Sequence, residues 1–307
     1  MKPFEKEFEA IVEKAKTVKT PVSVVIAGAD AENILQAAFE AEADGFCTPV
    51  LVGNQDKILA MLDKFGLKDR KYQLCSVAED ENPVQHAIDV VQIGMGDVLM
   101  RGNTSTRDFL MPILNKANKL LKNEILTEVA FVKVPEYNKI LHLSDVSVLI
   151  HPSVEQRKHV ISNMVEVLHG LGVDHPKIAV LSLVEKPSFH MRDTVEAQSI
   201  VRAHQNEPIA DCEIVGPIPW DLIVSKEAAR LKNYDCPYCG EFDGVCVPDV
   251  MAGNTLMKAL QMSAHFNSCG IIAGAKIPVA ITSRSSSIEQ AYLSIAVCAA
   301  LVAGKQK

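Results

Sequence analysis

The sequence predicts an α/β protein whose mainly parallel strands alternate with helices in two domains. Short β-branched runs, such as residues 22–26, alternate with longer segments whose apolar residues recur at helical spacing. This alternation runs through the whole chain, which at 307 residues has about the length of two domains. A composition of 48% hydrophobic and 22% charged residues is typical of a globular protein with a full core.

The first series of elements ends near residue 121. A helix over residues 4–18 precedes a strand over 22–26, and Asp30 can cap the next helix. Strands are then expected at residues 50–52, 72–77 and 97–100, followed by helices that end near residues 65, 93 and 121. No G-x-G-x-x-G motif follows the first strand, so the sequence does not support a dinucleotide-binding site.

The second series begins near residue 126, after an expected hinge at residues 122–127. The predicted strands lie at residues 129–134, 139–143, 148–150, 178–183, 212–215 and 244–247. The predicted helices lie at residues 154–171, 194–203 and 222–231. Two further apolar runs, residues 269–273 and 277–281, suit buried strands, and an Ala- and Leu-rich helix over residues 287–302 follows them.

Charge and targeting signals exclude several classes of protein. A net charge of −7 and a pI near 5.7 argue against a nucleic-acid binder. The N-terminus lacks the apolar region of a signal peptide, and no run reaches the roughly 18–20 apolar residues of a membrane span. We therefore expect a soluble, cytoplasmic protein with no nucleic-acid or membrane partner, whose eight cysteines are mostly reduced core residues.

Polar residues cluster where the strand at 277–281 ends. Ser283 and Arg284 come at its carboxyl end, where open α/β sheets bind ligands. Hydroxyls, backbone N–H groups and a guanidinium together suit an anion. The alternative is that residues 285–287 only cap the last helix. Glu289 either faces the same site or is a solvated acid at the helix N-terminus.

A second polar segment, R-G-N-T-S-T-R-D at residues 101–108, lies between a predicted strand and a predicted helix. Gly102 allows close approach of the backbone, and Thr104 and Ser105 offer hydroxyls at a helix N-terminus. Arg101 or Arg107 can hold a phosphate. An ordinary capped turn explains the pattern equally well.

A third segment, P-D-V-M-A-G-N at residues 248–254, leads from a strand into a helix. Gly253 and Asn254 suit the turn, Asn254 can also hydrogen-bond a polar ligand, and Lys258 lies one turn further on. Turn chemistry alone explains this segment.

The C-x-x-C pair of Cys236 and Cys239 has a third cysteine, Cys246, seven residues further on. This spacing matches no zinc framework, and the pair does not open a helix after a first strand as redox motifs do. Loop cysteines without function are the main interpretation, and a metal site or a redox pair are the alternatives.

Several motifs together resemble the phosphate acetyl/butyryltransferase family. They include P-D-V-M-A-G-N-T-L-M-K at residues 248–258, G-I-I-A-G-A-K-I-P-V-A-I-T-S-R at 270–284 and D-V-L-M-R-G-N-T-S-T at 97–106. L-S-D-V-S-V, I-A-V-L-S and G-P-I-P-W-D also match, so the resemblance covers nearly the whole chain in the right order. The length of the chain and the sequences of these motifs are most similar to those of the phosphate butyryltransferase branch.

The resemblance implies two α/β/α domains with an active-site cleft between them and a C-terminal helix that returns to the first domain. Domain 1 is then residues 1–125 with about residues 286–307, and domain 2 is residues 126–285. The implied reaction is acyl-CoA + phosphate ⇌ acyl phosphate + CoA, by direct transfer in a ternary complex. It needs no metal or nicotinamide cofactor, and the family's members are homo-oligomers, dimers or larger.

The resemblance also implies roles for the three polar segments. Ser283 and Arg284 match a catalytic pair, and Glu289 is the candidate base because Gln290 stands where the acetyl branch has Asp. The phosphate-binding residues would be Arg101, Gly102, Thr104 and Ser105, and the CoA and cleft residues would be Gly253, Asn254 and Lys258.

A second departure is Met111, which stands where the acetyl branch has an arginine. The sequence does not fix the length of the acyl chain. A phosphate acetyltransferase and a catalytically silent acyl-CoA-binding protein of the same fold are the alternatives. A metal- and NAD-dependent dehydrogenase would need an aspartate cluster that the sequence lacks.

Overall fold

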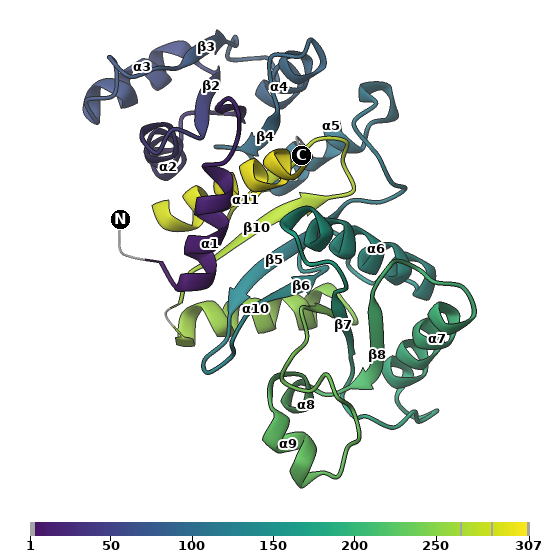
Figure 1. Ribbon diagram of the computed structural model, residues 1–307. Helices are drawn as coiled ribbons and strands as arrows, with labels where there is room; N and C mark the ends of the chain where they lie inside the picture. Colours follow the sequence, from purple (N-terminus) through teal and green to yellow (C-terminus); the bar gives the residue numbers. More distant parts are fainter. Residues whose placement is uncertain (1–3, 265, 284, 306–307) are drawn as a thin grey trace. The chain divides into compact units, whose positions relative to one another are not determined.

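The computed structural model describes residues 4–264, 266–283 and 285–305, and Arg284 therefore lies outside the described residues. The chain divides into two compact units. Figure 1 shows their helices and strands, coloured by position in the sequence. Unit 1 consists of Met1–Leu126 with Cys269–Lys307, and unit 2 consists of Thr127–Ser268. Helices and mainly parallel strands alternate in both units, which confirms the predicted fold class.

The strands of unit 1 lie in the order β3-β2-β1-β4-β11-β10. All neighbours pair in parallel except β10, which is antiparallel to β11. Nearly every residue of β1 and β4 is buried, which agrees with their mainly apolar sequences. The bounds are β1 (Val22–Ala27), β2 (Cys47–Gly53), β3 (Gln73–Ser76), β4 (Val98–Arg101), β10 (Ser268–Ala273) and β11 (Val279–Ile281).

The helices of unit 1 follow the predicted alternation with the strands. Their bounds are α1 (Lys6–Ala15), α2 (Glu32–Ala43), α3 (Gln55–Lys64), α4 (Pro83–Gln92), α5 (Thr106–Leu114), the 3₁₀ helix η1 (Lys116–Asn118) and α11 (Ile288–Lys305). Asn54 and Asn82 cap α3 and α4 through their side-chain oxygens.

Helix α11 is the central helix of unit 1. It packs against α1 and α2, and α1 lies across it in Figure 1. The ring of Tyr292 stacks on Phe4, with centroids 5.6 Å apart, and its hydroxyl donates to Asp44. By length and composition α11 could cross a membrane, contrary to the sequence expectation that no segment could, but 67% of it is buried inside the structure. A helix that is apolar on all sides is equally typical of a protein core.

The strands of unit 2 lie in the order β5-β6-β9-β7-β8. β5 and β6 are antiparallel, and the other neighbours are parallel. The strand bounds are β5 (Thr127–Lys133), β6 (Ile140–Ser144), β7 (Lys177–Leu181), β8 (Glu213–Ile218) and β9 (Gly244–Cys246). The helices are α6 (Val154–Leu171), α7 (Arg192–Asn206), α8 (Trp220–Val224), α9 (Lys226–Leu231) and α10 (Val250–Ala264).

The assignment of residues 269–285 to the second domain is wrong. β11 pairs in parallel with β4, with Val279 opposite Leu99, and β10 pairs with β11. These hydrogen-bonded ladders place both strands in the sheet of unit 1. The chain therefore returns to the first unit two strands earlier than expected.

Two predicted elements of unit 2 also differ from the structure. The strand expected at residues 148–150 is a loop, because the Asp145 carboxylate accepts the N–H groups of Val148 and Leu149. The helix expected at residues 222–231 is two helices, α8 and α9. Ser225 separates them with extended backbone (φ −135°) and caps α9 by accepting from the N–H of Ala228.

Candidate functional site

The carboxyl ends of β4 and β11 carry two of the three predicted polar segments. Because these strands are parallel neighbours, Arg101 and Thr282 emerge at the same edge of the unit 1 sheet. Arg101 is only 4% exposed, and its guanidinium donates to the Thr282 carbonyl oxygen. Its Nη1 also donates to Thr106 Oγ1 at 2.6 Å. One buried cation thus joins the two segments, so the structure brings Arg101 and the Ser283 turn together.

Gly102 lies where two backbone segments touch. Its N–H donates to Ala27 O at 2.9 Å, and the N–H of Asn103 donates to Gly28 O at 2.7 Å. A Cβ added to Gly102 would lie 2.0 Å from Gly28 O and 2.7 Å from Gly28 C. Only glycine fits there, as the sequence interpretation of close backbone approach predicted.

The hydroxyls that follow Gly102 have different environments. Ser105 is the N-cap of α5: its Oγ accepts from the N–H of Asp108 at 3.0 Å and donates to Asp108 Oδ2 at 2.6 Å. Thr104 Oγ1 is buried and has no hydrogen-bond partner among residues 4–264, 266–283 and 285–305. The capped-turn interpretation therefore explains Ser105, whereas the Thr104 hydroxyl is left for another role.

In the segment after β11, one serine hydroxyl caps α11 and the others do not. Ser287 and Gln290 form a reciprocal cap: Ser287 N–H donates to Gln290 Oε1 at 3.0 Å, and Gln290 N–H donates to Ser287 Oγ at 3.2 Å. Ser283 is exposed, and its Oγ lies 3.0 Å from Ser285 Oγ. Only Ser287 is needed for the cap, so Ser283 and Ser285 can face a ligand. Gln290 has a structural role at the position where the acetyl branch has Asp.

One further contact holds this segment, and the candidate base Glu289 lies directly after it. Asn33 on α2 donates through Nδ2 to Ser286 O at 2.8 Å, which anchors the turn from a third element of unit 1. Glu289 is half-buried in the first turn of α11. No described contact joins Glu289 to Ser283, so its assignment as base still depends on the family resemblance.

The third polar segment lies in unit 2, at the carboxyl ends of β6 and β9. These strands are parallel neighbours, with Ser144 opposite Cys246. Asn254 on α10 donates through Nδ2 to Val146 O at 3.1 Å. A Cβ on Gly253 would lie 3.0 Å from Asp145 O, so the first turn of α10 packs directly on the loop after β6. Lys258, one turn further along α10, is exposed.

Asp145 organises this edge of unit 2 and was not singled out from the sequence. It is 2% exposed, and its carboxylate accepts from the N–H groups of Glu128 at 2.9 Å and Leu149 at 2.6 Å, with further bonds from Ser147 and Val148. Burial raises the pKa of its carboxyl group, and these amides oppose that rise. The only signal in the sequence was an acidic residue directly after an apolar strand.

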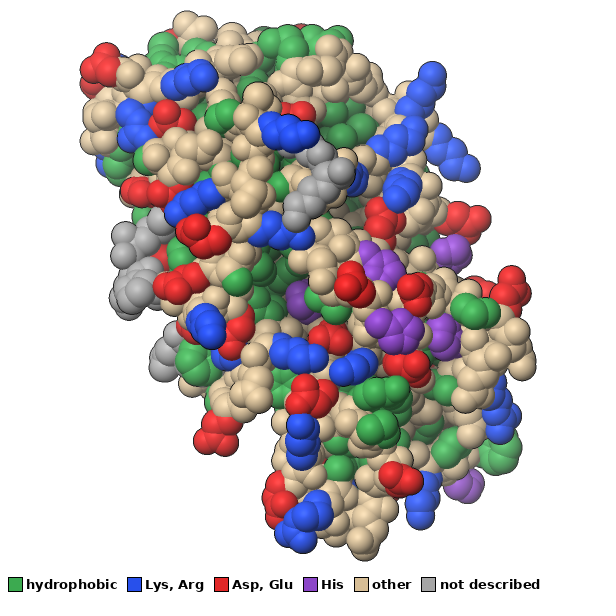
Figure 2. Space-filling view, viewed as in Figure 1, with side chains coloured by type: hydrophobic (Ala, Val, Ile, Leu, Met, Phe, Trp, Pro, Cys, Tyr) green, Lys and Arg blue, Asp and Glu red, His purple; other side chains and the backbone are tan. Residues whose placement is uncertain are grey.

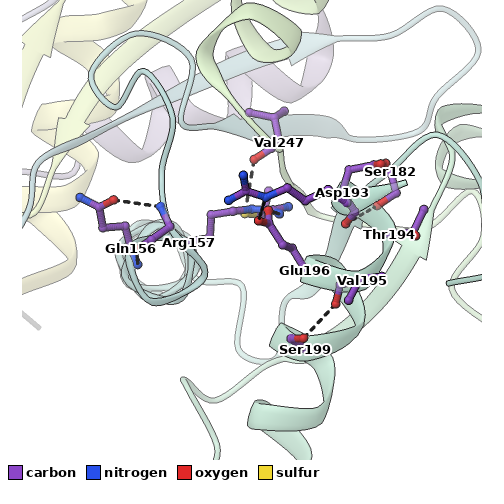
Figure 3. A network of polar contacts seen from close by, with 12 residues as sticks. Gln156, Arg157, Ser182, Asp193, Thr194, Val195, Glu196, Ser199 and Val247 are labelled. Atoms are coloured by element: carbon purple, nitrogen blue, oxygen red, sulfur yellow. Dashed lines mark hydrogen bonds and ion pairs between the residues drawn. The ribbon is translucent and has the colours of Figure 1, made fainter. Parts of the chain in front are cut away.

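A second unpredicted group is Arg157 on α6, which is fully buried (Figure 3). Its Nη1 lies 3.8 Å from Glu196 Oε2 on α7, and Glu196 also accepts from Arg192 Nε at 2.6 Å. Nε, Nη1 and Nη2 of Arg157 have no hydrogen-bond partner in the described part of the chain. Cys246 lies beside it: the guanidinium lowers the pKa of that thiol, although burial, the larger effect, raises it.

The described charged side chains are dispersed and of both signs on the face that Figure 2 shows. Among the residues that the structure describes, no three His, Cys, Asp or Glu side chains are grouped as metal ligands would be. On the face seen in Figure 2, Lys and Arg are interspersed with Asp and Glu over most of the surface. The eight cysteines are free, and Cys236 and Cys239 lie in the loop before β9.

Comparisons of the sequence with known proteins agree on one family. Residues 76–299 match the family described as phosphate acetyl/butaryl transferase. The phosphate butyryltransferase of Clostridium acetobutylicum is 30% identical over 301 residues, which are 98% of this chain and 99% of the relative. The phosphate acetyltransferase of Thermotoga maritima is 31% identical over 291 residues, 95% of this chain and 98% of that one. A branched-chain phosphotransacylase from Enterococcus faecalis, solved as a crystal structure, has a TM-score of 0.82 at 30% identity, and the match covers 92% of this chain and 99% of that one.

Proposed function

Because this chain belongs to the phosphate acetyl/butyryltransferase family, we propose that it transfers a short-chain acyl group between coenzyme A and inorganic phosphate. In one direction a phosphate oxygen attacks the thioester carbonyl, the C–S bond breaks, and CoA leaves as the thiolate. In the other direction the CoA thiolate attacks the acyl phosphate and phosphate leaves. Both substrates are bound together, and the protein needs no metal or nicotinamide cofactor.

The observation that carries the proposal is the Arg101 contact at the edge of unit 1. A guanidinium that is 4% exposed donates to Thr282 O, next to Ser283. A buried cation beside exposed hydroxyls attracts a phosphate and stabilises negative charge, because a site with little water screens the charge weakly. Two of its nitrogens already donate to protein oxygens, so Arg101 fixes the loop and supplies charge.

The other proposed phosphate ligands lie at the same edge of the unit 1 sheet. Thr104 Oγ1 is the hydroxyl without a described partner, and Gly102 allows the loop to lie against β1. Ser105 contributes by capping α5, whose N-terminus favours an anion. We assign the substrate phosphate to this loop.

The catalytic roles are assigned by the match to the family. Ser283 hydrogen-bonds the reacting groups, Arg284 stabilises the negative charge that develops in the transition state, and Glu289 is the candidate base. Loss of a donor to such a charge costs about 10²- to 10³-fold in kcat. We therefore expect Arg284→Ala to lose at least that much. Arg284→Lys keeps the charge but not the paired donors and is expected to recover only part of it. Unchanged kcat and KM in Arg284→Ala would refute the assignment.

Gly253, Asn254 and Lys258 are assigned to coenzyme A. Asn254 holds the first turn of α10 on the loop after β6, and the exposed Lys258 ammonium is available for a CoA phosphate. Lys258→Ala is expected to raise the KM for acyl-CoA and leave kcat nearly unchanged, because it removes binding that is equal in the ground and transition states.

A butyryl-like substrate, a cytoplasmic location and a homo-oligomer complete the proposal, with acetyl transfer and a silent acyl-CoA-binding protein as alternatives. The similarity to both a butyryltransferase and an acetyltransferase supports the reaction more strongly than the chain length. The test is thiol release from acetyl-, propionyl-, butyryl- and isobutyryl-CoA, each with and without phosphate. Phosphate-dependent release that is fastest with the four-carbon substrates is expected. Fastest release with acetyl-CoA favours the acetyl branch, and CoA binding without release with any substrate favours the silent protein.

A further inference from the structure

We propose that Cys236 and Cys239 form a reversible intramolecular disulfide, which makes the turn before β9 a site of thiol modification. The proposed acyl transfer does not use this pair, which lies in unit 2 between α9 and β9. The proposal is independent of the reaction that the protein catalyses.

The backbone already holds the two cysteines at a distance that a disulfide can span. The N–H of Cys239 donates to Cys236 O at 3.4 Å, which closes a four-residue turn. The ends of such a turn have Cα atoms less than about 7 Å apart. Disulfides join Cα atoms about 4.4–6.8 Å apart. The two side chains are also close enough to affect each other, since Cys236 raises the pKa of the Cys239 thiol beyond the effect of burial.

The turn is anchored on both sides. Before it, the N–H of Tyr234 donates to Ala229 O at 2.9 Å. After it, the N–H of Gly240 donates to Ile223 O at 3.0 Å, and Gly240 has a left-handed φ of +74°. These anchors keep the thiols together, so closing the disulfide requires little ordering of the chain.

The two sulfurs differ in access to solvent. Cys239 is 2% exposed and packs in the apolar core of unit 2 with Phe242 and Val245. Cys236 is half-buried at the margin of the same core. A small disulfide can therefore reach Cys236 first, while Cys239 is sheltered and becomes the second, resolving thiol.

A low-molecular-weight disulfide can oxidise the pair in two steps of thiol–disulfide exchange. The Cys236 thiolate attacks one sulfur of oxidised glutathione, forms a mixed disulfide and releases one glutathione thiolate. The Cys239 thiolate then attacks the Cys236 sulfur and releases the second glutathione. Two protein thiols are oxidised to one disulfide, the glutathione disulfide is reduced to two thiols, and the two protons pass to the released thiolates.

The same environment argues against a catalytic oxidoreductase. Burial is the main cause that raises the pKa of the Cys239 thiol to about 12, and Cys236 raises it further. Catalytic dithiols depend on a thiolate stabilised at neutral pH. The pair is therefore suited to slow, stoichiometric oxidation.

The test uses the native protein and oxidised glutathione as the probe. After incubation, remaining thiols are alkylated in denaturant, and the tryptic peptide of residues 233–258 is weighed. This peptide also contains Cys246, which is 0% exposed and serves as an internal control. The expected product carries one alkyl group, on Cys246, and has lost the mass of two hydrogen atoms. A thiol reductant is expected to restore a peptide with three alkyl groups.

Variants separate the disulfide from simple modification. Cys239→Ser is expected to stop at the glutathione adduct on Cys236, and Cys236→Ser is expected to leave Cys239 unmodified. Cys75 is the matched control, because it is also half-buried but lies on β3 in unit 1, and it is expected to yield only an adduct. The proposal is overturned if wild-type Cys236 and Cys239 both take the alkyl label, if glutathione stays on wild-type Cys236, or if either cysteine pairs with Cys246.

Discussion

Replacing Gly102 by alanine tests whether the contact between the β1 and β4 loops shapes the phosphate site. The new Cβ would lie 2.0 Å from Gly28 O, whereas real Cβ contacts are essentially never under 3.0 Å. Both neighbouring atoms belong to the backbone, so the loop must move by about 1 Å. That movement breaks the bonds from Gly102 N–H and Asn103 N–H, worth about 1 kcal/mol each. With about 1–3 kcal/mol of overpacking, the free energy of unfolding should fall by about 3–5 kcal/mol.

Activity should fall as well, because a shift of about 1 Å in a site can cost about 10²-fold in rate. The assay combines denaturant unfolding with kcat/KM measured at varied phosphate. Gly94→Ala is the matched control: it has a left-handed φ of +80° and nothing within 4 Å of the added Cβ. It should lose about 1 kcal/mol and keep its activity. A Gly102→Ala protein with wild-type unfolding and wild-type dependence on phosphate would refute the reasoning.

Three further predictions concern other parts of the chain. Glu196→Ala should lower the free energy of unfolding by about 3–5 kcal/mol, because it leaves the fully buried Arg157 guanidinium without its counter-charge. Arg157→Met removes the buried charge itself and should be neutral or stabilising by about 1–4 kcal/mol. Burial lowers the pKa of His142 to about 4 from its ordinary 6.5, so the folded protein should lose about 3 kcal/mol as the pH falls from 6.5 to 4, measured by denaturant unfolding. Ser283→Ala should lower kcat about 10²-fold and change the free energy of unfolding by less than about 0.5 kcal/mol, because the residue is exposed.

Each of these has a result that contradicts it. Equal losses of stability in Arg157→Met and Glu196→Ala would show that the buried Arg157 guanidinium stabilises the fold, which would contradict the first of these predictions. The sign for His142 follows from its lowered pKa: below pH 6.5 the unfolded chain binds a proton that the folded chain does not. His142→Gln should therefore be less sensitive to acid than the wild type, and identical pH profiles would contradict the assignment. Ser283→Ala with wild-type kcat would remove Ser283 from the site.

Local signals in the sequence predicted most of the fold. The strand that ends at Arg101 lies within one residue of the prediction, and Ser105 caps the helix that follows it, but that helix ends at Leu114 and not near residue 121. The same signals failed at residues 148–150, because the Asp145 carboxylate takes amides that a strand would have used. Apolar character alone does not reveal that competition.

Local signals in the sequence did not predict which strands pair or which charged side chains are buried. The runs that became β10 and β11 were recognised as strands, but the pairing of β11 with β4 joins residues about 180 positions apart, and β10 joins the sheet through β11. The position of Arg157 on α6 has the sequence of a solvated helix face, but the packing of α6 against other elements, among them α7 and β9, buries it. The hydroxyls of the candidate site were found because they follow strand ends, and their division into caps and free groups required coordinates.

The most direct test of the central claim is the ratio of acyl phosphate to free thiol formed from butyryl-CoA and phosphate. Phosphorus NMR measures the acyl phosphate, and a thiol reagent measures the CoA released in the same sample. Transfer between CoA and phosphate predicts equal amounts of the two products, and no thiol release when phosphate is left out. Thiol release without acyl phosphate would show hydrolysis instead of transfer and would contradict the account.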